Sequence, residues 1–176
     1  SWYRRQRQMC IRDSNVLGEY PGDPGPPGGD AAGVVREAPL LPHSTFGLGH
    51  APLASVAIAA TPFLANKPST LSFEQACTLP VTWSTTHAAV ERAGLRAGHA
   101  MVVQAAAGGV GLKAVEYAQW LRASIVGTAG RPHKHAQLHA TGVNALGSSR
   151  DGAAFTMGVT RQMAASRSHA VLNSLS

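Results

Sequence analysis

A glycine-rich turn is the part of this sequence whose residue types and spacing best suit a chemical task. It reads Ala106-x-Gly108-x-x-Gly111, with Gly109 and Val110 between Gly108 and Gly111. This order fits the G-x-G-x-x-G pattern with alanine in the first place. Glycines let backbone N–H groups approach a pyrophosphate closely, and the amino end of a following helix adds partial positive charge. The turn therefore predicts that these five residues bind the pyrophosphate of a dinucleotide.

The residues on either side of the turn predict the elements that must position it. Residues 101–105 form an apolar, β-branched run that is typical of a buried parallel strand. Residues 110–121 carry apolar side chains at helical spacing, and residues 124–128 form a second apolar run. Strand, glycine turn, helix and strand make the βαβ unit that binds dinucleotides. The alternative is a turn that only packs a helix on a sheet, and the surrounding pattern favours binding.

The residues after the second apolar run indicate which dinucleotide binds. An NAD site usually has an acidic residue there, about 20 residues past the turn, which bonds the ribose hydroxyls. This chain instead has Thr128 and then Arg131 and Lys134, without a carboxylate. Arginine can grip a 2′-phosphate with two parallel hydrogen bonds, so the sequence favours NADPH over NADH. The alternative is that Arg131 and Lys134 are only solvated charges at the start of a helix.

Further elements are predicted on both sides of this unit. We expect a short helix that begins with a capping box at Ser72 and Gln75, followed by helices over residues 80–93, 132–140 and 155–166. Short strands are expected over residues 143–146 and 170–172 and, earlier in the chain, from residue 33 and over residues 54–60 and 63–64.

Five stretches of the chain together resemble a known family. They are LGEYPG at residues 17–22, the stretch from Ser72 to His99, AAAGGVG at 105–111, SSRD at 148–151 and VLNSLS at 171–176. They resemble the enoyl reductase domains of polyketide and fatty acid synthases, from the zinc-independent, quinone oxidoreductase-like branch of the medium-chain dehydrogenase/reductase superfamily. The resemblance implies an α/β fold, with a Rossmann-type parallel sheet and a GroES-like, β-rich catalytic domain.

The resemblance also divides the chain into parts. Residues 1–14 are polar and basic, and we interpret them as a non-native or disordered tail. Residues 15–70 are expected to be part of the GroES-like catalytic domain, and residues 71–176 part of the NADP-binding Rossmann domain. Strands that the family has before the first of these parts and after the second are missing, so we expect a fragment with an incomplete sheet and a truncated catalytic domain.

The resemblance supplies candidates for proton transfer to the α-carbon of an enoyl thioester. Tyr20 matches a tyrosine proposed as the proton donor, and Lys134 and Asp151 match a proposed donor pair in which the aspartate holds the lysine. Lys134 is then a candidate for two tasks, of which we favour phosphate binding. The alternatives are packing of Tyr20 on a loop and an N-cap role for Asp151, which we favour for that residue.

The resemblance also places Asn173, Thr82 and Thr86 near the nicotinamide half of the coenzyme. For the two threonines the alternative is helix packing and local bonding to the backbone.

Composition and charge exclude several other functions. The formal net charge is +6, and residues 1–14 carry half of it, so no basic stripe indicates a nucleic-acid partner. No apolar run reaches the ~20 residues of a membrane span. Eight histidines occur, but only His135 and His139 share a helix face and no third ligand is near, so no metal site is expected.

Two classes of function remain. The first is an NADPH-dependent enoyl reductase that acts on acyl-carrier-bound or CoA-bound thioesters, with a quinone or alkene reductase of the same fold as its rival. The second is a non-catalytic, truncated fragment that binds nucleotide. We expect a cytoplasmic protein, with a plastid as the alternative, and a homodimer through the Rossmann domain in the full-length protein.

Overall fold

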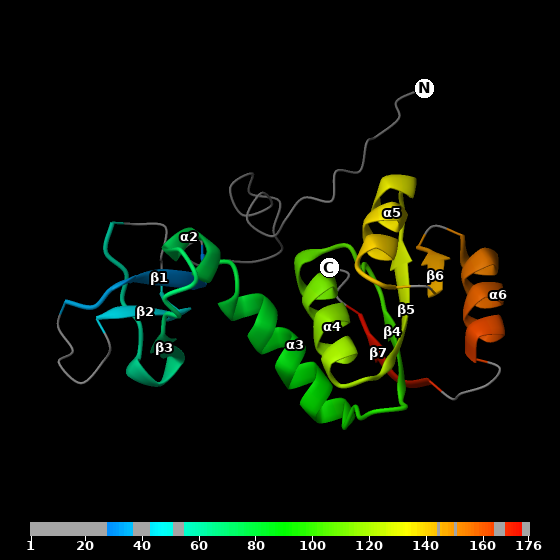
Figure 1. Cartoon of the computed structure of the whole chain (residues 1–176), viewed down its shortest axis with the longest axis horizontal. Helices are drawn as coiled ribbons and strands as arrows, with labels where there is room; N and C mark the ends of the chain where they lie inside the picture. Colours follow the sequence, from blue (N-terminus) through cyan, green and yellow to red (C-terminus); the bar gives the residue numbers. More distant parts are fainter. Residues whose placement is uncertain are drawn as a thin grey trace, which may run out of the picture. The chain divides into compact units, whose positions relative to one another are not determined.

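The computed structural model of the chain describes residues 28–36, 43–50, 55–143, 145–149, 151–163 and 168–173 (Figure 1). The chain divides into two compact units, Ser1–Val81 and Thr82–Ser176. This division falls inside helix α3 (Pro80–Ala93), whereas the sequence predicts a domain boundary between residues 70 and 71. Tyr20 and the tail of residues 1–14 lie outside the described residues.

The first unit contains a small antiparallel sheet. Strands β1 (Asp30–Val34), β2 (Ser44–Leu48) and β3 (Leu64–Asn66) pair in the order β1-β2-β3, and the 3₁₀ helix Thr61–Phe63 leads into β3. The prediction of a strand over residues 54–60 is wrong for the described residues 55–60. Within them, only Ile58 pairs, in an isolated bridge with His50. The expected capping box at Ser72 is present and begins α2 (Phe73–Ala76).

The second unit contains a four-stranded parallel sheet with the order β6-β5-β4-β7. Its strands are β4 (Ala100–Val103), β5 (Ser124–Ala129), β6 (Ala145–Ser148) and β7 (Ser168–Leu172). Helices α4 (Gly109–Trp120), α5 (Pro132–Ala140) and α6 (Gly152–Met163) connect them in turn. The strand order reverses between β4 and β7, and in doubly wound folds this switch point is where nucleotides bind.

Alternating side chains of β4 face two separate layers of the core. Met101 and Val103 pack in a cluster with buried residues of α4 and with Leu138 of α5. Val102 packs on the other face, in a cluster that includes Phe155 of α6. Figure 1 accordingly shows α6 on the opposite side of the sheet from α4. None of the described helices combines the length and the apolarity that a membrane span requires.

An aromatic ladder joins α3 to α4 on the surface of the second unit. The ring of Tyr117 lies edge-on to Trp83, with 5.8 Å between centroids, and stacks on Trp120 at 5.4 Å. The Tyr117 hydroxyl is also within hydrogen-bond distance, 3.1 Å, of His87 Nδ1. Trp83 is partly buried, whereas Trp120 is 72% exposed.

Candidate nucleotide-binding site

The glycine turn begins where β4 ends, and the strands on both sides of β4 hold it. Gln104 N donates to Leu172 O of β7 at 2.9 Å. Ala106 N donates to the carbonyl of Thr128 at the end of β5, also at 2.9 Å, and Ala105 N donates to Thr128 Oγ1 at 3.2 Å. The turn is therefore fixed at the carboxyl edge of the sheet, beside the switch point between β4 and β7.

Helix α4 starts from this turn with its first backbone donors available. Gly108 is the N-cap, its backbone is extended, and no side chain caps the helix. The N–H groups of Gly109, Val110 and Gly111 find no acceptor within the part of the chain that is described, and the first turn contains no acidic residue. Free donors at the positive end of a helix dipole suit an anion, so the geometry fits a bound pyrophosphate.

Close packing explains the last glycine of the turn. A Cβ on Gly111 would lie 2.5 Å from Ala105 O and 2.7 Å from Ala106 C, which are rigid backbone atoms. On Gly108 the nearest atom would be 3.2 Å away, again Ala105 O, and on Gly109 it would be the Thr82 methyl group at 3.4 Å. Gly111 therefore allows α4 to start directly on the turn. A Cβ on Gly108 would be tighter than ordinary van der Waals contact, and one on Gly109 would just reach it.

Two cations follow the end of β5. Arg131 is the N-cap of α5 and its side chain is exposed, while Lys134 lies in the first turn and is partly buried. Neither side chain makes an ion pair with any residue that the structure describes. No carboxylate occurs in the first turn of α5. The carboxyl end of β5 is thus positively charged and lacks the acid that would receive a free ribose hydroxyl.

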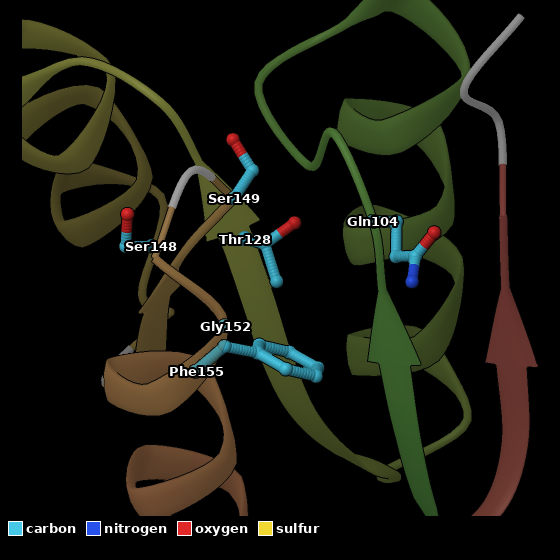
Figure 2. A pocket seen from close by; sticks show the side chains of 6 residues that line it. All are labelled: Gln104, Thr128, Ser148, Ser149, Gly152 and Phe155. Carbon is cyan, nitrogen blue, oxygen red and sulfur yellow. The ribbon is translucent and has the colours of Figure 1, made fainter.

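A small pocket opens at the carboxyl ends of three strands. Its volume is about 130 Å³, and it is lined by Gln104, Thr128, Ser148, Ser149, Gly152 and Phe155. Figure 2 shows the side chains of Thr128 and Ser149 between the Phe155 ring, which lies below them, and Gln104, which lies across the pocket. A whole dinucleotide needs a larger cavity, since ligand pockets commonly measure about 300–1,000 Å³. The pocket therefore has room for only a part of one.

The chain is similar in sequence to parts of polyketide synthases. No family profile matches the chain. It is 43% identical over 134 residues to the spectinabilin polyketide synthase system protein NorB of Streptomyces orinoci, which is 71% of this chain and 6% of that protein. It is 37% identical over 136 residues to erythronolide synthase EryA2 of Saccharopolyspora erythraea, which is 73% of this chain and 4% of that protein.

The chain is similar in structure to enoyl reductases and quinone oxidoreductases. The CurK enoyl reductase superposes with a TM-score of 0.77 and 30% identity, over 87% of this chain and 48% of its own. In sequence and fold the chain is similar to enoyl reductases and quinone oxidoreductases. The quinone oxidoreductase from Thermus thermophilus, which has also been solved with NADPH, superposes with a TM-score of 0.65 and 31% identity, over 81% of this chain and 48% of its own. The chain spans about half the length of these two solved reductases.

The predicted threonines Thr82 and Thr86 connect helices α3 and α4. Thr86 is fully buried, and its hydroxyl donates to Thr82 O at 2.8 Å and reaches Val110 O at 3.5 Å. The Thr82 methyl group lies against Gly109. Both residues therefore fasten α3 to the first turn of α4. Their placement near the nicotinamide stays a prediction.

The predicted donor pair lies at the starts of two successive helices, Lys134 in the first turn of α5 and Asp151 just before α6. Asp151 directly precedes α6, and its carbonyl accepts the N–H of Phe155 at 2.9 Å, which is the backbone arrangement of an N-cap. Lys134 and Asp151 both follow the carboxyl ends of neighbouring strands, but no ion pair between them occurs in the described structure. Their role as a donor pair stays a prediction, as does the role of Tyr20.

Asn173 directly follows strand β7. Asn173 is exposed and follows Leu172, the β7 residue whose carbonyl holds the start of the glycine turn. It therefore lies at the switch point. Its placement beside the nicotinamide stays a prediction. Among the described residues, no group of three or more His, Cys, Asp or Glu could hold a metal ion.

Proposed function

We propose that this chain functions in NADPH-dependent enoyl reduction, the transfer of a hydride to the β-carbon of an α,β-unsaturated acyl thioester. One observation carries the proposal. The free amino end of α4 meets, along one edge of the sheet, a β5 terminus that bears Arg131 and Lys134 and no carboxylate. Similarity to two polyketide synthases supports a thioester substrate made in polyketide or fatty acid synthesis.

Each predicted residue has a task in this proposal. The N–H groups of Gly109, Val110 and Gly111 hold the pyrophosphate, and Arg131 with Lys134 holds the 2′-phosphate. Bound NADPH supplies the hydride.

The other candidates lie toward the reacting end. Thr82, Thr86 and Asn173 orient the nicotinamide half. Tyr20 gives the proton to the α-carbon. The alternative donor is Lys134 held by Asp151, in which case Arg131 holds the 2′-phosphate without Lys134. The substrate is carried on an acyl carrier or on CoA, the full-length protein pairs through its Rossmann domain, and its compartment is the cytoplasm.

The coenzyme part of the proposal is tested by calorimetric titration of the chain with NADPH and with NADH. Because one charge-assisted phosphate contact contributes about 1.5–3 kcal/mol, NADPH is expected to bind at least about tenfold more tightly. Equal affinities would refute NADPH specificity.

The reaction is tested with crotonyl-CoA and NADPH, by following the loss of absorbance of the reduced nicotinamide. Turnover with crotonyl-CoA and none with a benzoquinone is the expected result. The opposite preference would favour a quinone reductase, for which the likeness to the Thermus thermophilus enzyme is the specific observation. Binding of NADPH without turnover of either substrate would favour a non-catalytic nucleotide-binding chain.

A further inference from the structure

The side chain of His135 ties the start of α5 back to the end of β5. Its Nε2 lies 2.7 Å from Ala129 O, so the ring N–H donates to that carbonyl. The ring is partly buried. The same carbonyl also accepts Ser149 N, from the residue after β6, at the longer distance of 3.3 Å. One imidazole thus contacts the point at which β5, the residue after β6 and the first turn of α5 meet.

The backbone of His135 holds the other end of the same short turn. Its N–H donates to Arg131 O at 3.2 Å, and the N–H of Lys134 donates to the same oxygen at 3.0 Å. His135 therefore bonds to both Ala129 and Arg131 and closes the loop between them. One turn further along α5, Leu138 is fully buried in the core.

Little else in the described residues fixes the direction of Arg131. As N-cap of α5 it has no side-chain capping bond, and its own side chain is exposed. Pro132 fixes one backbone angle after it, but donates no hydrogen bond. In the described residues, the His135–Ala129 bond is the side-chain hydrogen bond that links the first turn of α5 to the end of β5.

We propose that His135 is the positioning residue for recognition of the 2′-phosphate. It acts through Arg131 and Lys134 and makes no contact with the phosphate itself. This inference rests on the proposed NADPH function. A planar, bidentate arginine contact depends strongly on direction, so releasing the turn should weaken binding of the 2′-phosphate and leave the rest of the nucleotide nearly unaffected.

Amide substitutions separate positioning from simple packing. H135Q places an amide N–H about as far from the backbone as imidazole Nε2, so it can restore the bond to Ala129 O. H135N carries the same amide one methylene shorter and cannot reach, and H135L removes the donor. His139 lies on the same helix, is exposed and is outside the proposed site, so H139L is the matched control.

The test is calorimetric titration of the 176-residue chain and its variants with adenosine 2′,5′-bisphosphate and with adenosine 5′-monophosphate. These probes differ only in the 2′-phosphate. H135N and H135L are expected to lower the ratio of the two affinities about tenfold, the equivalent of one lost hydrogen bond to a charged group. H135Q and H139L are expected to keep the ratio of the unsubstituted chain.

The outcomes separate the inference from the proposed function. An unsubstituted chain that prefers the bisphosphate, with the same preference in H135N and H135L, would overturn the inference and leave the proposed function intact. The inference also fails if H135N weakens both probes equally, or if H135Q behaves like H135N. If the unsubstituted chain has no preference, NADPH specificity and the role of His135 are both overturned. Should H135L fail to fold, the comparison of H135Q with H135N still decides.

Discussion

Gly111 is the residue whose missing side chain the turn most depends on. A Cβ added there would lie 2.5 Å from Ala105 O, and no flexible group is there to yield. We expect Gly111→Ala to lower the free energy of unfolding by about 1–3 kcal/mol through overpacking. Urea unfolding followed by circular dichroism measures the change.

Gly152 provides the control for this substitution. It is also near the amino end of a helix, and a Cβ there would meet nothing within 4 Å. Gly152→Ala should therefore leave stability unchanged or raise it slightly, because alanine has the better helix propensity. Equal losses in the two variants would show that the close approach at Gly111 has no energetic consequence.

Thr128 is a second residue on which the turn depends, because it accepts two backbone bonds from it. The side chain is 2% exposed, and its Oγ1 accepts the N–H of Ala105. Thr128→Val keeps the shape but leaves that N–H without its acceptor, which should cost about 1–3 kcal/mol of unfolding free energy. Thr128→Ser, which keeps the hydroxyl, should lose much less in the same unfolding experiment. A valine variant as stable as the serine variant would contradict this account.

At the scale of elements, the start of α5 is where coenzyme preference should be decided. Arg131 is exposed there and has no ion-pair partner among the described residues. We expect Arg131→Ala to weaken NADPH binding about tenfold or more, by loss of a charge-assisted contact, and to leave NADH binding nearly unchanged. Calorimetric titration with both coenzymes measures this.

The control for that experiment is an arginine on another helix. Arg92 is exposed in the last turn of α3, and Arg92→Ala removes the same charge from the protein. It should leave both affinities unchanged. An equal effect of the two substitutions would show that net charge, and not the placement of Arg131, sets the preference.

Elements with strong local signals were predictable from the sequence. The bounds of α3 and α5 match the expected 80–93 and 132–140, because each helix begins at a proline and breaks off before a glycine-containing turn. Helix α6 was expected from residue 155 but begins at Gly152, since its first turn is small and aperiodic. Strand β2 was missed because Ser44–Leu48 mixes polar and small residues, and its pairing with β1 and β3 is a tertiary effect.

Only those parts of the candidate site that depend on a local sequence pattern could be predicted. The glycine turn and the cations after β5 lie where the sequence indicated, between a strand and a helix. The partners of the Thr128 and Thr86 hydroxyls depend on which elements meet in space, so no local pattern could supply them. The sequence does not indicate the bond from His135 to Ala129, because that bond depends on the angle between α5 and β5.

At the scale of the whole molecule, acid should weaken the second unit through a histidine pair that joins β4 to β7. The ring of His99 stacks on that of His169 at 3.9 Å, and His169 Nδ1 accepts the N–H of Ala100. The pKa of His99 lies below its usual 6.5. Burial of the ring is the largest cause, followed by the positive charges of His169 and Arg96. His99 Nδ1 is buried and has no partner in the described part of the chain.

The sign of the pH dependence follows from this lowered pKa. The unfolded chain takes up the proton more readily than the folded chain, so stability is fully present above about pH 6.5 and falls as the pH drops through the folded pKa. Melting temperatures measured from about pH 8 to about pH 5.5 should therefore decrease on the acid side. His99→Phe should flatten this decrease, whereas His133→Phe, at an exposed position, should not. An unchanged slope in His99→Phe would contradict the assignment to this ring.

The aromatic ladder on α3 and α4 provides an intrinsic fluorescence signal for nucleotide binding. Two of the three tryptophans in the sequence, Trp83 and Trp120, flank Tyr117 on the two helices that meet at the glycine turn. Indole emission overlaps the absorption band of a reduced nicotinamide, so a dinucleotide seated at that turn would accept excitation from both indoles by resonance energy transfer. Binding of a reduced dinucleotide at the glycine turn can then be followed as a decrease in tryptophan fluorescence, in real time and without a label.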